Sequence, residues 1–93
     1  MKLEFEWDRA KARNNFSKHG IRFDLAAKVF EDPFAIEFLD NRRHHAEARF
    51  VIFGMADGQL LYVAYTERES RIRIISARRA TKYEQEQYFQ ENS

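Results

Sequence analysis

Two apolar runs joined by an Asp-Gly turn constrain the fold of this 93-residue chain most strongly. In an extended conformation, residues 49–55 and 60–65 would be apolar on both faces, which is typical of strands inside a sheet. The linker Ala56-Asp57-Gly58-Gln59 lies between them, and Asp-Gly in such a context strongly favours a two-residue hairpin turn. The sequence therefore predicts an antiparallel pair of inner strands.

The residues before this hairpin predict a short strand and two helices. Residues 3–7 alternate apolar and polar side chains, as in a strand with one buried face. Asp8 is suited to cap a first helix that ends at Gly20. Asp24 is suited to cap a second helix that ends at Asp32-Pro33, and apolar residues four positions apart give this helix the better buried face.

The remaining residues predict two more strands and a final helix. Segments 34–39 and 71–77 alternate in the manner of strands. Thr81 and Glu84 form a capping box that opens the last helix. We therefore expect one α+β domain over residues 1–93, in the order β-α-α-β-β-β-β-α, with an antiparallel sheet, two N-terminal helices and one C-terminal helix.

Composition narrows the classes of protein that fit. The chain contains no cysteine, which excludes a disulfide framework and cysteine-ligated zinc. The N-terminus is charged where a signal peptide would be apolar, and the longest apolar run, 60–65, is too short to span a bilayer. We expect a soluble cytoplasmic domain that uses no cofactor.

Arginine is concentrated in the segment 68–82 of a chain that is otherwise close to neutral. The whole chain has 16 basic and 15 acidic residues, whereas this segment has six basic residues and the single acid Glu69. Its cations are Arg68, Arg71, Arg73, Arg78, Arg79 and Lys82. Because the planar guanidinium group suits phosphate and carboxylate recognition, the segment predicts an anionic partner.

From about Leu3 to Tyr88 the sequence resembles the BrnT toxins of bacterial type II toxin–antitoxin pairs. The combination of Lys18-His19-Gly20 with the run Ile72-Arg73-Ile74-Ile75-Ser76-Ala77-Arg78-Arg79-Ala80 is more specific than either motif alone. The other matching positions are Glu6-Trp7-Asp8, Lys11, Asn15, Phe23, Glu47, Arg49-Phe50, Gly54, Tyr65-Thr66-Glu67-Arg68 and Glu84.

This resemblance implies a RelE-like fold and metal-independent ribonuclease activity. It also implies neutralisation by a cognate BrnA-type antitoxin, in a complex of two toxins and two antitoxins. Through the antitoxin, that complex would bind and repress its own promoter DNA.

Cleavage of RNA without a metal uses the 2′-hydroxyl as nucleophile and needs a base, an acid and cations for the phosphorane. His19 is a candidate for proton transfer because imidazole titrates near neutrality, although histidine before a terminal glycine is also a common helix ending. Lys18 beside it is expected to assist catalysis, either as a phosphate contact or as a local positive charge. Glu67 is a second candidate base, but an ion pair with Arg68 or Arg71 would make it a weaker one.

Arg78 is the first choice for stabilising the phosphate, since it lies between a strand and a capped helix whose backbone N–H groups also favour anions. Arg71 and Arg73 leave the same face of the predicted strand. They either contact RNA or form the solvent-exposed face of an edge strand, paired with Glu67 and Glu69.

Arg49, Arg79 and Lys82 complete the expected contacts to RNA phosphate. Arg49 either points into the site or pairs with Glu47. Arg68 either clamps phosphate or occupies a solvated turn.

Two further interpretations remain open. His44-His45 suggests a metal site, but adjacent loop residues rarely bind one ion together, so a solvated basic loop is favoured and no metal is expected. The whole protein is alternatively a non-catalytic module that binds nucleic acid or protein through the segment 68–82.

Overall fold

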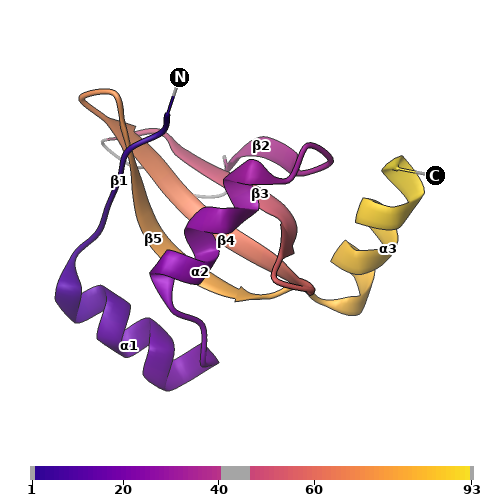
Figure 1. Cartoon of the computed structure of the whole chain (residues 1–93), viewed down its shortest axis with the longest axis horizontal. Helices are drawn as coiled ribbons and strands as arrows, with labels where there is room; N and C mark the ends of the chain where they lie inside the picture. Colours follow the sequence, from indigo (N-terminus) through magenta and orange to yellow (C-terminus); the bar gives the residue numbers. More distant parts are fainter. Residues whose placement is uncertain (1, 41–46, 93) are drawn as a thin grey trace.

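The computed structural model describes residues 2–40 and 47–92, which form a five-stranded sheet with helices packed against it (Figure 1). The His44-His45 pair lies outside these residues. The elements in chain order are β1 (Phe5–Glu6), α1 (Arg9–His19), α2 (Phe23–Ala27), the 3₁₀-helix η1 (Lys28–Glu31), β2 (Ile36–Asp40), β3 (Arg49–Ala56), β4 (Gln59–Arg68), β5 (Arg71–Arg79) and α3 (Lys82–Glu91). The predicted α+β class and element order are confirmed, and the RelE-like comparison stays a prediction.

The predicted central hairpin is confirmed. Strands β3 and β4 pair antiparallel down to Ala56 and Gln59, and the two turn residues Asp57 and Gly58 both have positive φ, 47° and 80°. This is the backbone of a type I′ turn, which twists in the direction that the flanking strands require. The strand order β1-β5-β4-β3-β2 places both strands inside the sheet.

Strand β1 departs from the expected antiparallel sheet, because it pairs parallel with β5 through Phe5–Ile72 and Glu6–Arg73. Parallel pairing requires a long crossover connection, and all the intervening helices and strands supply it. The pairing also moves β5 away from the sheet edge, so the alternative in which Arg71 and Arg73 form the solvent-exposed side of an edge strand is wrong.

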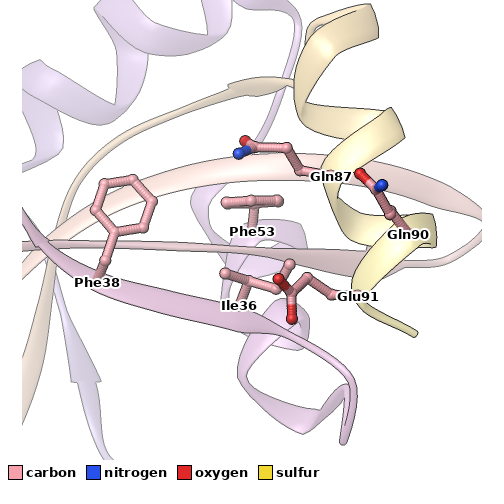
Figure 2. Close-up of a pocket in the computed structure, with 6 residues that line it drawn as sticks. All are labelled: Ile36, Phe38, Phe53, Gln87, Gln90 and Glu91. Carbon is pink, nitrogen blue, oxygen red and sulfur yellow. The ribbon is translucent and has the colours of Figure 1, made fainter. Parts of the chain in front are cut away.

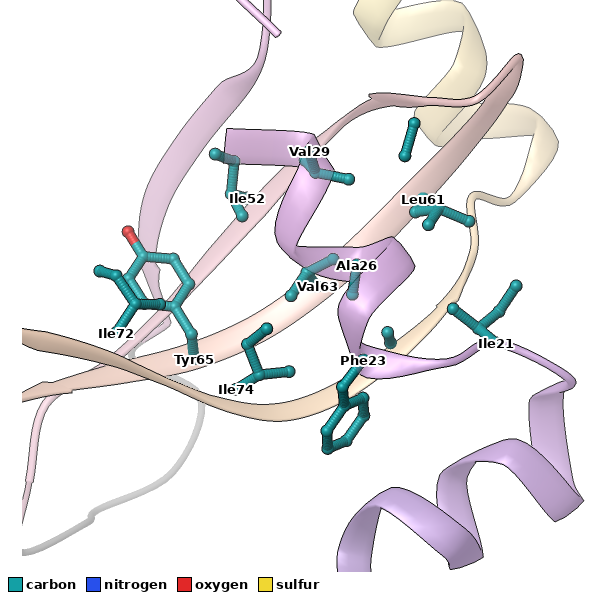
Figure 3. Packing of buried hydrophobic residues seen from close by; sticks show 12 residues of the cluster. Ile21, Phe23, Ala26, Val29, Ile52, Leu61, Val63, Tyr65, Ile72 and Ile74 are labelled. Carbon is teal, nitrogen blue, oxygen red and sulfur yellow. The ribbon is translucent and has the colours of Figure 1, made fainter. Parts of the chain in front are cut away.

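The main core lies between the sheet and α2 with η1. Alternating strand residues such as Ile52, Val63 and Ile74 point to this side, which we call the α2 face, and pack against Ala26 and Val29 (Figure 3). The second helix begins at Phe23, one residue before the predicted cap. Its N-cap is Arg22, whose side chain makes no capping hydrogen bond, so the expected cap at Asp24 is wrong. Asp24 lies in the first helical turn, where a carboxylate still favours the helix dipole.

The opposite side, which we call the α3 face, carries a smaller core. Val51 and Phe53 pack there against Tyr88 of α3. The Thr81–Glu84 capping box opens this helix as predicted. The Tyr88 hydroxyl donates to Asp32 Oδ2 at 2.6 Å, which ties α3 to the loop before β2. Within the described ranges, no helix is long and apolar enough to cross a membrane.

Helix α1 is attached to β5 by a buried asparagine. Asn15 is 7% exposed and donates from Nδ2 to the backbone oxygens of Ile21 at 3.1 Å and Ala77 at 2.8 Å. Its Oδ1 accepts from the Ala77 N–H at 3.0 Å. Strand β1 pairs with β5 only as far as Arg73, so Asn15 satisfies the β5 backbone beyond the end of that short partner.

Candidate functional site

The arginine-rich segment spreads over the whole length of β5. Arg71 begins β5 beside the β4–β5 turn, whereas Arg79 ends the strand and donates to the carbonyl of His19, the last residue of α1. Eight residues of extended chain separate these two arginines by about 26 Å. The sequence-predicted residues therefore fall into two groups: one near the β4–β5 turn and one near His19.

A β-bulge decides which arginines share a face. Ser76 pairs with Ala64 and Ile74 with Tyr65, so Ile75 is an extra residue in β5. Without it, Arg73 and Arg78 would point to opposite sides, since they are an odd number of positions apart. With it, both side chains lie on the α3 face.

Near the β4–β5 turn, the α3 face carries a pocket of about 210 Å³ in which cations from four elements meet. We call it the basic pocket. Its lining residues are Lys11 of α1, Glu47 just before β3, Arg49 at the start of β3, Thr66 and Arg68 of β4, and Arg73 and Ile75 of β5. The structure thus brings together three of the predicted residues, Arg49, Arg68 and Arg73.

Arg68 is held by Glu47 in this pocket. The two side chains form a short ion pair, and the Thr66 hydroxyl lies 3.4 Å from Glu47 Oε2 and donates to the Ala48 carbonyl at 2.7 Å. The hydrogen bond from Arg68 lowers the pKa of Glu47, and the same bond raises the pKa of Arg68. Both groups are therefore charged at neutral pH, and the guanidinium has a fixed position.

Arg73 and Arg71 pair with carboxylates of the β1 segment. Arg73 Nη1 donates to Glu6 Oε2 at 2.9 Å, and Arg71 lies 3.8 Å from Glu6 and 3.9 Å from Glu4. The alternative that paired these arginines with Glu67 and Glu69 is therefore wrong. Because β1 lies directly beside β5, its carboxylates reach these arginines first.

Arg78 is engaged by α3. Its two terminal nitrogens donate to the two carboxylate oxygens of Glu84, each at 2.9 Å, and its guanidinium carbon lies 3.9 Å from the centre of the Tyr62 ring. Burial would raise the pKa of Glu84, but the hydrogen bonds from Arg78 and Thr81 outweigh it and lower the pKa. Arg78 here orients α3 by the bidentate geometry that it would use on a phosphate.

The group near the far end of β5 consists of Lys18, His19, Arg79 and Lys82. Arg79 Nη1 donates to the His19 carbonyl at 3.3 Å, and Gly20 ends α1 with a left-handed φ of 71°, as predicted. Lys18 and Lys82 are exposed on their helices. His19 and the basic pocket therefore lie at opposite ends of β5 and do not form one site within a single chain.

Glu67 points away from the basic pocket. It follows Thr66 on β4, so its side chain lies on the α2 face, where it lines a cavity of about 390 Å³ together with Glu37 and Tyr65. The Tyr65 hydroxyl donates to Glu37. Burial, that hydrogen bond and the nearby carboxylates of Glu37 and Glu67 raise the pKa of Tyr65.

Another pocket, of about 160 Å³, lies between β2, β3 and α3 (Figure 2). Ile36, Phe38 and Phe53 form its strand side, and Gln87, Gln90 and Glu91 its helix side. It contains no cation, so it is not suited to hold phosphate. Among residues 2–40 and 47–92, no three His, Cys, Asp or Glu side chains are grouped as metal ligands would be.

The sequence did not assign a role to Glu6, Lys11, Glu47 or Thr66 in this site. Arg73 and Glu6 are 67 positions apart, and only the parallel β1–β5 pair brings them together. The sequence contained one signal for the role of Lys11. The cations Arg9 and Lys11 oppose the helix dipole at the start of α1, which indicates that they do not serve to stabilise this helix.

Comparison with models of protein families gives a match that covers most of the chain. The family model described as the ribonuclease toxin BrnT of type II toxin–antitoxin systems matches residues 7–84. A search of curated proteins finds no match.

Proposed function

This chain belongs to the BrnT family of ribonuclease toxins from type II toxin–antitoxin systems, and we propose that it cleaves RNA in the basic pocket of β3, β4 and β5. The observation that carries the proposal is the meeting of Lys11, Arg49, Arg68 and Arg73 from four elements. Membership of the family also means that an antitoxin is its partner.

The pocket is suited to hold a phosphodiester. Ion pairs to Glu47 and Glu6 fix Arg68 and Arg73 before any RNA binds, so little reorganisation is needed when charge develops on the phosphorane. The side chains of Arg73 and Arg68 are 29% and 48% exposed, so solvent and substrate reach both. Thr66 adds a hydroxyl group to the lining of the same pocket.

We propose that the RNA 2′-hydroxyl attacks the adjacent phosphorus and that no metal takes part. Glu47 accepts the hydroxyl proton, because it is the carboxylate that lines the pocket; the ion pair with Arg68 lowers its pKa and so makes it a weak base. Lys11 donates a proton to the departing 5′-oxygen, and the arginines stabilise the phosphorane between these two steps. The products are a 2′,3′-cyclic phosphate and a 5′-hydroxyl end.

The other cationic residues and the histidine that the sequence predicted for the site do not line the basic pocket, and this proposal gives them other roles. Arg71 extends the cationic surface toward the β4–β5 turn. Arg78 supports α3 through Glu84 on the same face of the sheet. Lys18, His19, Arg79 and Lys82 lie too far along β5 to share the phosphate in the basic pocket.

The mechanism is tested by incubating the isolated protein with single-stranded RNA in EDTA and identifying the product ends. Cyclic phosphate and 5′-hydroxyl ends formed in EDTA support the proposal. Cleavage that needs a divalent metal, or that leaves 5′-phosphate ends, contradicts it. Salt-sensitive RNA binding without cleavage would instead support the non-catalytic module.

We further propose that the antitoxin is of the BrnA type and that the two proteins form a complex of two toxins and two antitoxins, which represses its own promoter. The support is the family alone. Mass measurement of the co-expressed pair tests the stoichiometry, and a one-to-one complex would contradict it. Promoter binding that depends on the antitoxin subunit tests the repression.

A further inference from the structure

Helices α1 and α2 enclose a groove that the proposed RNA site does not use. It has a volume of about 470 Å³, and its apolar side chains are Trp7, Ala12, Phe16 and Phe23. The Trp7 and Phe23 rings pack edge to face at 5.9 Å and form part of its lining. Phe16 is 47% exposed, although it is one of the largest apolar side chains on α1. An apolar groove with an exposed aromatic residue of this kind marks an interaction surface.

The polar lining of the groove is predominantly cationic. Arg13 and Arg22 line it, and the guanidinium carbon of Arg22 lies 5.3 Å from the centre of the Phe16 ring. Asp24 is the acid among its lining residues.

Helix α1 itself increases this positive charge. Between Arg9 and His19 it contains four lysine and arginine residues and no acid. Cations in its first turn oppose the helix dipole and lower the stability of the helix. Such a composition favours binding of an acidic partner rather than stability.

We infer that this groove is the docking site for an acidic amphipathic segment of the antitoxin. One large apolar side chain of that segment enters between Phe16 and Phe23, and its carboxylates face Arg13 and Arg22. The inference rests on the part of the proposed function that gives this toxin a protein partner. It does not depend on which residues cleave RNA.

A protein segment fits the groove better than RNA does. The lining combines apolar side chains with arginines at the margin, which is the arrangement of an interface with an apolar centre and a charged rim. A nucleobase has polar edges, and apart from the arginines only Ser17 and Asp24 offer it polar side chains here.

The position of the groove explains how docking there would neutralise the toxin. Lys11 lines the basic pocket, whereas the next two residues, Ala12 and Arg13, line the groove. The two sites are therefore separated by the width of one helix. A segment seated in the groove places its own acidic residues beside the cations that would hold RNA, and competes with RNA by proximity and charge.

The test compares Phe16→Asp with Phe89→Asp in binding to the purified antitoxin encoded beside the toxin gene. Phe89 is a matched control because it is an aromatic residue of another helix that is 58% exposed. Binding is measured by calorimetry. We expect Phe16→Asp to weaken binding by about 30-fold or more, as for loss of a central aromatic anchor, and Phe89→Asp to change it less than about twofold.

A second variant keeps the test decisive if Phe16→Asp does not fold. Arg13→Glu changes an exposed position and should weaken binding by about tenfold, with a smaller dependence on salt. Equal affinities for wild type, Arg13→Glu and folded Phe16→Asp would overturn the inference. RNA cleavage by the free variants is recorded separately. Loss of cleavage with unchanged antitoxin binding would identify the groove as an RNA subsite and would also overturn the inference.

The proposed function can fail separately from this inference. A wild-type protein that binds antitoxin through the groove but cleaves no RNA would contradict the proposed function alone.

Discussion

Replacing Asn15 should detach α1 from the sheet and destabilise the protein strongly. In Asn15→Ala, three buried backbone groups lose their partners: the Ala77 N–H, the Ala77 carbonyl and the Ile21 carbonyl. Each unsatisfied buried group costs at least ~1 kcal/mol, so the free energy of unfolding should fall by about 3 kcal/mol. The free energy of unfolding of a typical domain is only about 5–15 kcal/mol, so this loss is a large share of it.

Urea unfolding followed by circular dichroism measures this loss, with Asn14→Ala as the control. Asn14 is the exposed neighbour on the same helix, and its replacement should change the free energy of unfolding by less than about 0.5 kcal/mol. Amide exchange at Ala77 should also accelerate in Asn15→Ala. A loss below about 1 kcal/mol, or unchanged exchange at Ala77, would refute the role assigned to Asn15.

Asn15→Asp separates the donor role from the acceptor role. The carboxylate still accepts from the Ala77 N–H, but it places a charged oxygen against the carbonyls of Ile21 and Ala77. Those carbonyls disfavour the ionised form, so the folded state raises the pKa of the introduced carboxyl. Its cost is therefore largest at neutral pH and decreases as the pH falls, because the protonated carboxyl can donate to one carbonyl.

Two further predictions concern the loop that carries Asp32. In Gly54→Ala, the new Cβ would lie 2.9 Å from both Ala35 Cβ and Asp32 Oδ2, so the free energy of unfolding should fall by about 1–3 kcal/mol, measured by thermal unfolding. Burial would raise the pKa of Asp32, but hydrogen bonds from the Met55 N–H, Tyr88 and the backbone nearby outweigh it and lower the pKa. The stability that Asp32 contributes is therefore present above a pH of about 4 and is lost as the pH falls through its lowered pKa. Tyr88→Phe should remove about 1 kcal/mol or more near neutrality and make acid unfolding less steep; an acid titration identical to wild type would contradict this.

Local sequence signals predicted most of the elements. The Asp57-Gly58 turn, the Gly20 helix end and the Thr81–Glu84 capping box each depend on residues within a few positions of one another, and all three are confirmed. Their conformations follow from backbone sterics and hydrogen bonds between nearby residues, so the identities of those residues are enough to predict them.

The parallel β1–β5 pair was not predictable in the same way. It joins residues almost seventy positions apart, and no local pattern specifies a partner at that distance. The expected partners of Arg71 and Arg73 were wrong for this reason, because the carboxylates that reach them come from β1.

The composition of the segment 68–82 indicated an anionic partner but did not locate the site. An extended strand distributes neighbouring residues over two faces and a length of about 26 Å. The bulge at Ile75 then placed Arg73 and Arg78 on the same face, and Glu84 engaged Arg78 there. Only the packing of four elements showed which cations meet.

The central claim is that RNA is cleaved in the basic pocket, and the most direct test compares cleavage rates of variants from the two ends of β5. Arg49→Ala and Arg68→Ala should each lower the rate by about a hundredfold or more on the same RNA, with folding unchanged by circular dichroism. His19→Ala should lower it by less than about tenfold, because His19 lies at the opposite end of the strand. A large loss in His19→Ala with near wild-type rates in the two arginine variants would contradict the account and place the site beside the C-terminus of α1.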